Sequence, residues 1–177
     1  MHITIQNLIH IQSKIKEKIN ILNYDNYKPE VIAVSKTFKM DHISPLIDYG
    51  HRNFGENKVQ ETLEKWSEIK LQNPEIQLHM LGKLQTNKVK QAIRIFDYIH
   101  SVDSIKLAQK IHNEQEKINR ELKLFIQVNI GSETQKSGIE INELDNLVKF
   151  CNNNSLNVVG LMCLPPYEKN SGKFFKE

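Results

Sequence analysis

Six short, mostly apolar runs alternate with longer amphipathic stretches along this chain, and this alternation restricts the fold more than any other feature. The runs have the length of strands and cover residues 31–34, 52–54, 77–81, 98–102, 124–130 and 158–162. Between them, apolar residues recur at steps of three and four, which is typical of helices that bury one face. Thr86 is a candidate cap for the helix at residues 89–96, and Ser101 or Asp103 for the helix that follows. Buried strands alternating with helices predict an α/β fold with a parallel sheet, either an open sheet or a (β/α) barrel.

The N-terminal segment lies outside this alternation and predicts an extra helix. Its apolar residues follow one another at steps of three or four: Leu8, Ile11, Ile15, Ile19 and Leu22. A turn-rich break at residues 23–29 separates this helix from the first strand. The expected architecture is therefore one N-terminal helix followed by about six strand–helix units.

Charge and cysteine usage exclude several classes of function. Lys and Arg number 24 against 21 Asp and Glu, and the net charge of +3 is too small to predict nucleic-acid binding. Cys151 and Cys163 do not have the spacing of a metal site, so we expect two free thiols in a reducing compartment. No apolar run approaches 18 residues, and no secretory signal is recognisable. The sequence predicts a cytoplasmic protein with no metal site and no membrane span.

Polar residues collect near the carboxyl ends of the predicted strands, where barrel proteins build their sites. These residues are Lys36, Asn57, His79, Ser101 and Asn129. Neither GxGxxG after the first strand nor GxxxxGK[ST] occurs, so the two common phosphate-binding loops of open sheets lack support. We therefore expect a site built from several strand ends.

Two of these residues have chemistry that can be weighed individually. Lys36 follows a strand that we expect to be buried, and partial desolvation would free its amine as a nucleophile for Schiff-base formation. The alternative is a surface lysine whose stem covers apolar neighbours. His79 lies inside an apolar run, and the alternative to a site residue is a core histidine with satisfied ring nitrogens.

A series of short motifs follows in one order along the chain. They are AVSKT (33–37), FGEN (54–57), HMLG (79–82) with LQTNK (84–88), SVD (101–103), QVNI (127–130), KSG (136–138) and GLM (160–162). Together they resemble the pyridoxal phosphate homeostasis protein family, single-domain relatives of the alanine racemase barrel. FGEN combined with the pattern HxxGxLQ[ST]NK is the most specific part of the resemblance, which runs from the N-terminal helix almost to the end of the chain.

The resemblance implies a TIM-type (β/α) barrel that binds pyridoxal 5′-phosphate (PLP). By its place in AVSKT, Lys36 matches the lysine that holds the cofactor as a Schiff base, while Asn57 and His79 match residues that line the cofactor pocket. Family members are regarded as non-enzymatic, so no catalytic residue is implied. The implied function is intracellular PLP homeostasis, with PLP as the ligand and PLP-dependent apoenzymes as further partners.

The resemblance also implies two further strands, which carry the phosphate grip and an arginine facing the pyridine nitrogen, and this sequence lacks both. Only fifteen residues follow Met162, whereas two more units of roughly 25 residues each would complete an eight-unit barrel. We therefore expect a single PLP-binding domain over residues 1–177 that is incomplete, with about six of eight units. Its open strand edges should self-associate, and its hold on PLP should be weak.

Three other functions compete with this interpretation. The first is an alanine-racemase-like enzyme, which would need an acid or base on the opposite cofactor face from a separate domain. The second is an inactive truncated remnant. The third is a module that binds some other anion through the basic segment 83–90, although that segment lacks the aromatic residues that stack on nucleic acids. A visible chromophore that borohydride bleaches would separate PLP binding from the rest.

Overall fold

The computed structural model describes residues 1–24, 26–130 and 137–165. Its strands are β1 (Ala33–Val34), β2 (Asn53–Glu56), β3 (Gln77–Met80), β4 (Tyr98–Val102), β5 (Lys123–Val128) and β6 (Val158–Cys163). Its helices are α1 (Ile3–Leu22), α2 (Met40–Asp48), α3 (Val59–Gln72), α4 (Val89–Ile95), α5 (Ile105–Ile118) and α6 (Ile141–Asn153), with a short 3-10 helix, η1 (Thr86–Lys88), before α4. Each predicted strand and the N-terminal helix are present. The sequence after β6 begins like a sixth helix, but residues 166–177 lie outside the described residues.

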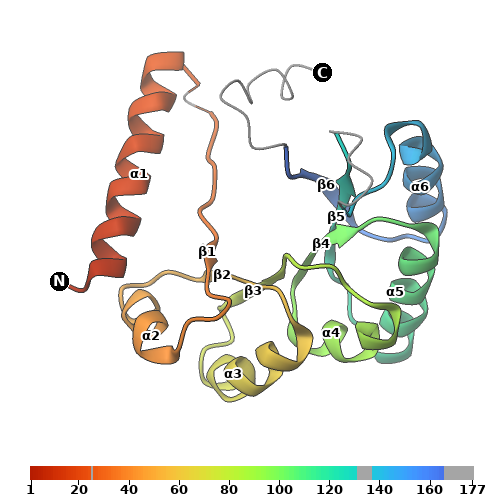
Figure 1. The fold of residues 1–177 in the computed structure, drawn as a ribbon, viewed down its shortest axis with the longest axis horizontal. Helices are drawn as coiled ribbons and strands as arrows, with labels where there is room; N and C mark the ends of the chain where they lie inside the picture. The colour runs from red at the N-terminus through yellow and green to blue at the C-terminus, as the bar shows by residue number, and fades with distance from the viewer. Residues whose placement is uncertain (25, 131–136, 166–177) are drawn as a thin grey trace.

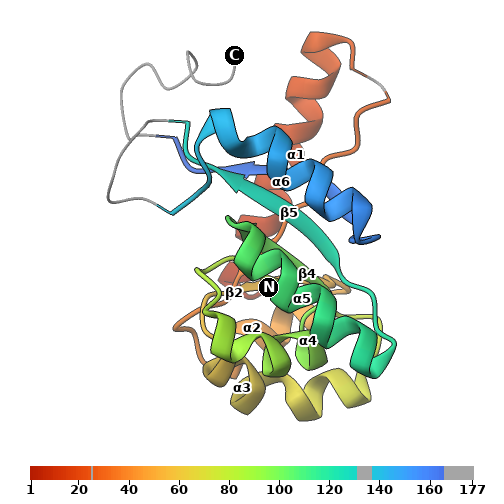
Figure 2. The same cartoon turned by 90° about the vertical axis from the view of Figure 1, so that its right-hand side faces the viewer.

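All strand pairs in the described sheet are parallel, and the strands lie in the order β1-β2-β3-β4-β5-β6. In a doubly wound open sheet, the order in which successive strands are added reverses at a switch point. Here each strand lies next to the one that follows it in the chain, which is the order found in a barrel. Figure 1 shows the strands as an arc with helices α2 to α6 around its outside and α1 at the β1 end. In Figure 2 the curved sheet is seen from its side, with the same helices covering it. The structure therefore confirms the barrel-type α/β fold, with six parallel strands in the described part of the chain and a helix after each of the first five.

The two faces of the sheet are distinguished by contacts with α3. Phe54 packs on Trp66 of α3 with ring centroids 4.9 Å apart, and Glu56 accepts a hydrogen bond from the same Trp66 indole. Successive side chains of a strand point to opposite faces, so Gly55 faces the concave side, away from the helices. Gly55 pairs with His79 in β3, which places His79 on that concave side as well.

The hydrophobic core lies between the sheet and its outer helices. Its largest completely buried side chains come from both layers: Trp66, Phe54, Phe96, Ile76, Leu78, Met80, Ile93, Ile99, Ile111, Leu122, Leu124 and Ile126. Burying a side chain of this size contributes about 1.5–3 kcal/mol. This single packed layer fixes the strand ends that carry the candidate site.

The starts of two helices differ from the sequence-based expectation. Thr86 was expected to cap the helix at residues 89–96, but it begins the 3-10 helix η1 and forms no capping hydrogen bond. Ser101 or Asp103 was expected to cap the following helix, and Ser104 does so instead, accepting a hydrogen bond from the Leu107 N–H. Both differences arise because the chain uses a few more residues to turn from strand to helix than the polar pattern suggests.

Two further expectations concern the cysteines and the membrane. Cys151 is buried, Cys163 is half-buried, and neither forms a disulfide. Across the described ranges we find no helix that combines the length and the apolar character needed to cross a bilayer.

Candidate functional site

Lys36 and Asn57 follow neighbouring parallel strands at the same edge of the sheet. Val34 at the end of β1 pairs with Gly55 in β2, and Lys36 and Asn57 each stand two residues further along. Lys36 is exposed and Asn57 is half-buried. The register thus brings these two predicted site residues to adjacent strand ends.

Lys36 occupies a turn whose two flanking residues are held in place, while its own side chain is exposed. Ser35 before it is buried, and Thr37 after it has a φ of 65°, a left-handed conformation that is unusual for a β-branched residue. The Lys36 side chain has no hydrogen-bond or ion-pair partner among the described residues. The expectation that Lys36 is partly desolvated is wrong for this structure, because the turn follows an edge strand and its outer side is open to solvent.

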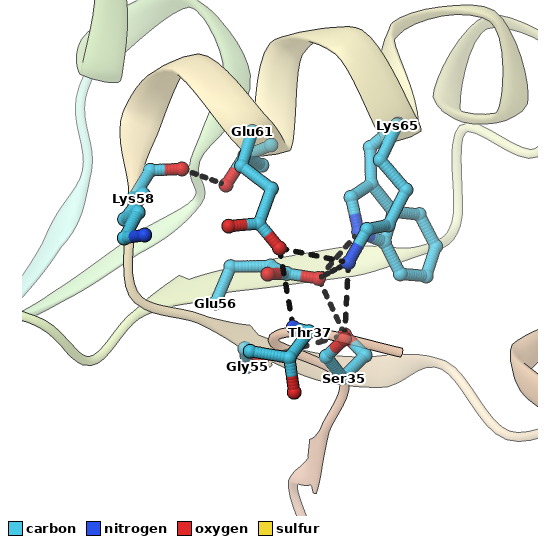
Figure 3. A network of polar contacts seen from close by, with 9 residues as sticks. Ser35, Thr37, Gly55, Glu56, Lys58, Glu61 and Lys65 are labelled. Carbon is cyan, nitrogen blue, oxygen red and sulfur yellow. Dashed lines mark hydrogen bonds and ion pairs between the residues drawn. The ribbon is translucent and has the colours of Figure 1, made fainter. Parts of the chain in front are cut away.

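A buried carboxylate lies directly beneath this turn. Glu56 has no exposed surface, and its Oε1 accepts hydrogen bonds from the Ser35 hydroxyl (2.8 Å), the Lys65 ammonium (2.9 Å) and the Trp66 indole N–H (3.0 Å). Figure 3 shows Ser35, which follows β1, converging with Glu56 of β2 and Lys65 of α3. A buried charge is costly unless it is paired and hydrogen-bonded, and the Lys65 ammonium supplies the opposite charge here.

Asn57 is positioned by a close approach between two of the sequence motifs. A Cβ atom added at Gly82 would lie 2.3 Å from the Asn57 carbonyl oxygen, so only glycine allows this contact. Beside it, Asn57 lines an open cleft of about 340 Å³ together with Lys58, Lys83 and Lys88. Lys36 is not among the residues that line this cleft. FGEN and HMLG are therefore linked physically, and their junction adds positive charge to the C-terminal edge of the sheet.

His79 lies one layer deeper than Lys36 and Asn57, inside β3 rather than at its end. Its side chain is buried, and both ring nitrogens have partners. Nε2 lies 3.1 Å from the Asn53 side-chain oxygen and Nδ1 lies 3.0 Å from Nε2 of His100. Because an amide oxygen only accepts, His79 donates through Nε2, and its Nδ1 accepts from the His100 Nε2–H. This geometry fixes the tautomers of both rings.

The two histidines belong to a series of stacked rings on the concave face. The His79 ring stacks on Tyr98 at 4.3 Å, and the His100 ring stacks on Phe125 at the same distance. Burial lowers the pKa of His79 to about 3, with the nearby His100 contributing less, and burial lowers the pKa of His100 to about 4. Both rings are therefore neutral at physiological pH, when they can still donate and accept as described.

The structure separates the five predicted polar residues into two groups. Lys36, Asn57 and Asn129 follow the ends of β1, β2 and β5, as expected. His79 and Ser101 lie within β3 and β4, and both are buried. The Ser101 hydroxyl has no hydrogen-bond partner within the described part of the chain.

Sequence reasoning missed several residues that build this region. In the sequence, Glu56 stands out only as part of the FGEN motif, and no pattern distinguishes Lys65 or His100. The available signal for this contact was the spacing of Glu56, which stands two residues after the core residue Phe54 and nine residues before Lys65. It becomes informative only when the register shows that Glu56 faces α3.

Comparison with known proteins gives a consistent assignment for nearly the entire chain. The family model described as the alanine racemase N-terminal domain matches residues 7–176. A protein of Pasteurella multocida (strain Pm70), named pyridoxal phosphate homeostasis protein, is 34% identical over 161 residues, which cover 90% of this chain and 69% of that protein.

Two solved structures extend the comparison. PipY of Synechococcus elongatus PCC7942 with PLP bound aligns with a TM-score of 0.73 and 32% identity, covering 89% of this chain and 73% of PipY. An alanine racemase of Clostridium difficile 630 aligns with a TM-score of 0.65 but only 13% identity, over 90% of this chain and 44% of the racemase. The second likeness shows the fold alone.

Proposed function

Since this chain belongs to the pyridoxal phosphate homeostasis protein family, which shares the alanine racemase N-terminal domain, we propose that it binds PLP and serves intracellular PLP homeostasis. The observation that carries the proposal is the turn at Lys36. Its flanking residues are fixed by hydrogen bonds, while the lysine amine is exposed and unpaired among the described residues. PipY, a relative with 32% identity, has been solved with PLP bound.

Lys36 is the residue that holds the cofactor in this proposal. The cofactor supplies an aldehyde that reacts with amines. With PLP present, Lys36 would hold it as a Schiff base through its amine, and the aldehyde would supply the carbon for that bond, with its oxygen lost as water. The residues present fit this chemistry, because an exposed lysine on a fixed turn is accessible to an aldehyde and is not paired with any carboxylate of the described residues.

Asn57 and His79 line the cofactor pocket in the same proposal. Asn57 stands beside Lys36 at the end of the adjacent strand, where its amide can donate to and accept from a polar ligand. His79 lies below them on the concave face. Burial keeps its ring neutral, and both ring nitrogens already have partners. The lysines at 58, 83 and 88 add positive charge beside Asn57, which suits a phosphorylated ligand.

We assign a binding role rather than an enzymatic one. Racemisation needs a proton donor and a proton acceptor on opposite faces of the substrate carbon. Of the relatives at 32–34% identity, one is named a pyridoxal phosphate homeostasis protein and the other was solved with PLP bound. The likeness to alanine racemase, at 13% identity, rests on the fold alone. The alternative, a racemase-like activity through the same lysine, predicts turnover that depends on Lys36.

The proposal includes partners and a location. A protein that holds PLP through a reversible covalent bond can release it to PLP-dependent apoenzymes, which we propose as recipients. We place this exchange in the cytoplasm, where the two unpaired thiols of Cys151 and Cys163 are stable in reduced form. One core spans the described elements, which supports a single cofactor-binding domain over residues 1–177.

The test is a PLP titration followed by absorbance of the Schiff base. The wild-type chain should develop a saturable visible band that borohydride bleaches, and Lys36→Ala should not. Lys39→Ala is the matched control, because Lys39 is also an exposed lysine three residues further along. The proposal is wrong if Lys36→Ala retains the wild-type band, or if Lys39→Ala loses it to the same extent.

A further inference from the structure

The turn that carries Lys36 is attached to helix α3 through one buried ion pair. The Glu56 carboxylate and the Lys65 ammonium are 2.9 Å apart, with 0% and 12% of their side chains exposed. The Ser35 hydroxyl donates to Glu56 Oε1, and the Lys65 ammonium donates to the Ser35 carbonyl at 3.0 Å. Both members of the pair therefore bind the residue immediately before Lys36 (Figure 3).

The residue after Lys36 is held from the same helix. The Thr37 N–H donates to Glu61 Oε1 at 3.1 Å, and Glu61 lies 3.7 Å from the Lys65 ammonium. Thr37 has a φ of 65°, a conformation that costs an L-residue about 1–2 kcal/mol and persists only when surrounding contacts impose it. Lys36 thus sits between two anchored residues.

Stability alone is a poor explanation for this arrangement. Replacing a buried ion pair by apolar side chains of similar volume is often neutral or stabilising, so such pairs are weak evidence for a stabilising role. The hydrogen bonds to Glu56 Oε1 link α3 to the Lys36 turn, and Oε2 has no partner among the described residues. What the pair specifies is the path of the backbone on either side of Lys36.

We propose that Glu56 and Lys65 are positioning residues that fix the Lys36 turn so that its amine is presented to an aldehyde ligand. This inference rests on the proposed function. With the pair intact, the turn is ordered before the ligand arrives, and binding carries no further cost of ordering it. Without the Glu56 carboxylate, the Ser35 hydroxyl is left with its longer hydrogen bond to the Gly55 carbonyl (3.3 Å), and the turn samples other conformations.

A matched control exists on the same helix. Lys70 of α3 forms an ion pair with Asp97, whose Oδ2 also accepts a hydrogen bond from the Leu78 N–H at 2.8 Å. Both pairs use a lysine of α3 and a partly or fully buried carboxylate. Asp97 directly precedes β4, so its pair lies at the opposite edge of the sheet from Lys36. Asp97→Asn should destabilise the fold without disturbing the Lys36 turn.

The experiment compares wild type, Glu56→Gln and Asp97→Asn at a temperature at which all three are folded. PLP affinity, the share of borohydride-fixed label on Lys36, and amide hydrogen exchange of residues 35–38 without ligand are measured. Glu56→Gln should weaken PLP binding about 10- to 100-fold, the range expected when groups that orient a ligand-binding residue are removed. It should also accelerate exchange at residues 35–38 and spread label to other lysines, while Asp97→Asn matches wild type in all three.

The inference fails if Glu56→Gln binds PLP like wild type with unchanged exchange, or if Asp97→Asn weakens binding equally. If Glu56→Gln does not fold, Ser35→Ala takes its place, because it removes one hydroxyl and leaves the pair and Trp66 in contact. Ser35→Ala should then weaken binding about tenfold; wild-type affinity there overturns the inference. A wild-type chain with no Lys36 adduct refutes the proposed function instead, and the exchange data still decide whether the pair orders the turn.

Discussion

Acid should destabilise this protein well above the range in which carboxylates titrate, because two buried histidines on the concave face must be neutral in the folded state. Burial lowers the pKa of His79 to about 3 and that of His100 to about 4, from an ordinary value of 6.5. Between those values and 6.5 the unfolded chain binds more protons than the folded chain, so stability falls as the pH falls.

The magnitude follows from these pKa values. A histidine that stays neutral in the folded state at pH 5, but has a pKa of 6.5 when unfolded, loses about 2 kcal/mol of stability relative to pH 7. The two together give about 4 kcal/mol, a large share of the roughly 5–15 kcal/mol that stabilises a typical domain. The lowered pKa of the half-buried His51 acts in the same direction.

The assay is urea unfolding at several pH values between 7 and 5, for wild type and for His100→Phe. Phenylalanine keeps the stack on Phe125 but removes one titrating group and the donor to His79 Nδ1. At pH 7 the variant should be less stable by about 1–3 kcal/mol, because a buried acceptor loses its partner. This difference in stability between the variant and wild type should shrink as the pH falls, because the variant has one histidine fewer that takes up a proton on unfolding. If both proteins lose stability in parallel between pH 7 and 5, the account of His100 as a buried neutral group is wrong.

Three further predictions concern the core, the motif junction and catalysis. Gly82→Ala should lower the free energy of unfolding by about 1–3 kcal/mol, since its Cβ would lie 2.3 Å from the Asn57 carbonyl oxygen; an unchanged urea midpoint would contradict this. Trp66, the single tryptophan, is completely buried, so its fluorescence should resist iodide quenching until urea unfolds the chain. Alanine racemisation should not exceed that of a Lys36→Ala control, and L-to-D conversion that depends on Lys36 would refute the binding role.

Strand positions could be predicted from the sequence because burial on both sides of a parallel sheet demands apolar runs of strand length. The run at residues 98–102 matches β4 at both ends, and the run at 158–162 matches β6 within one residue. Helix starts were predicted less well. Ser104, rather than Ser101 or Asp103, caps α5, because the choice among nearby polar residues depends on how many residues the turn uses.

The polar groups that support the site could not be predicted without the strand register. Glu56 and Lys65 meet because Glu56 faces α3, and His79 meets His100 because neighbouring strands place both on the concave face. The separation of 21 positions between the two histidines carries no meaning in the sequence alone. The apolar run around His79 correctly predicts that this residue lies in a buried strand. Its contacts with Asn53 and His100 could not be foreseen, because they depend on the strand register.

The central claim, that Lys36 is the lysine that holds PLP, is tested most directly by mapping the site of attachment. The full chain is incubated with PLP, reduced with borohydride and digested, and the pyridoxyl mass is located by mass spectrometry. The account predicts that the label at low PLP excess resides on the peptide containing Lys36, with Lys39 and the lysines at 58, 83 and 88 essentially unmodified. Label distributed evenly over these exposed and half-buried lysines, with no preference for Lys36, would contradict it.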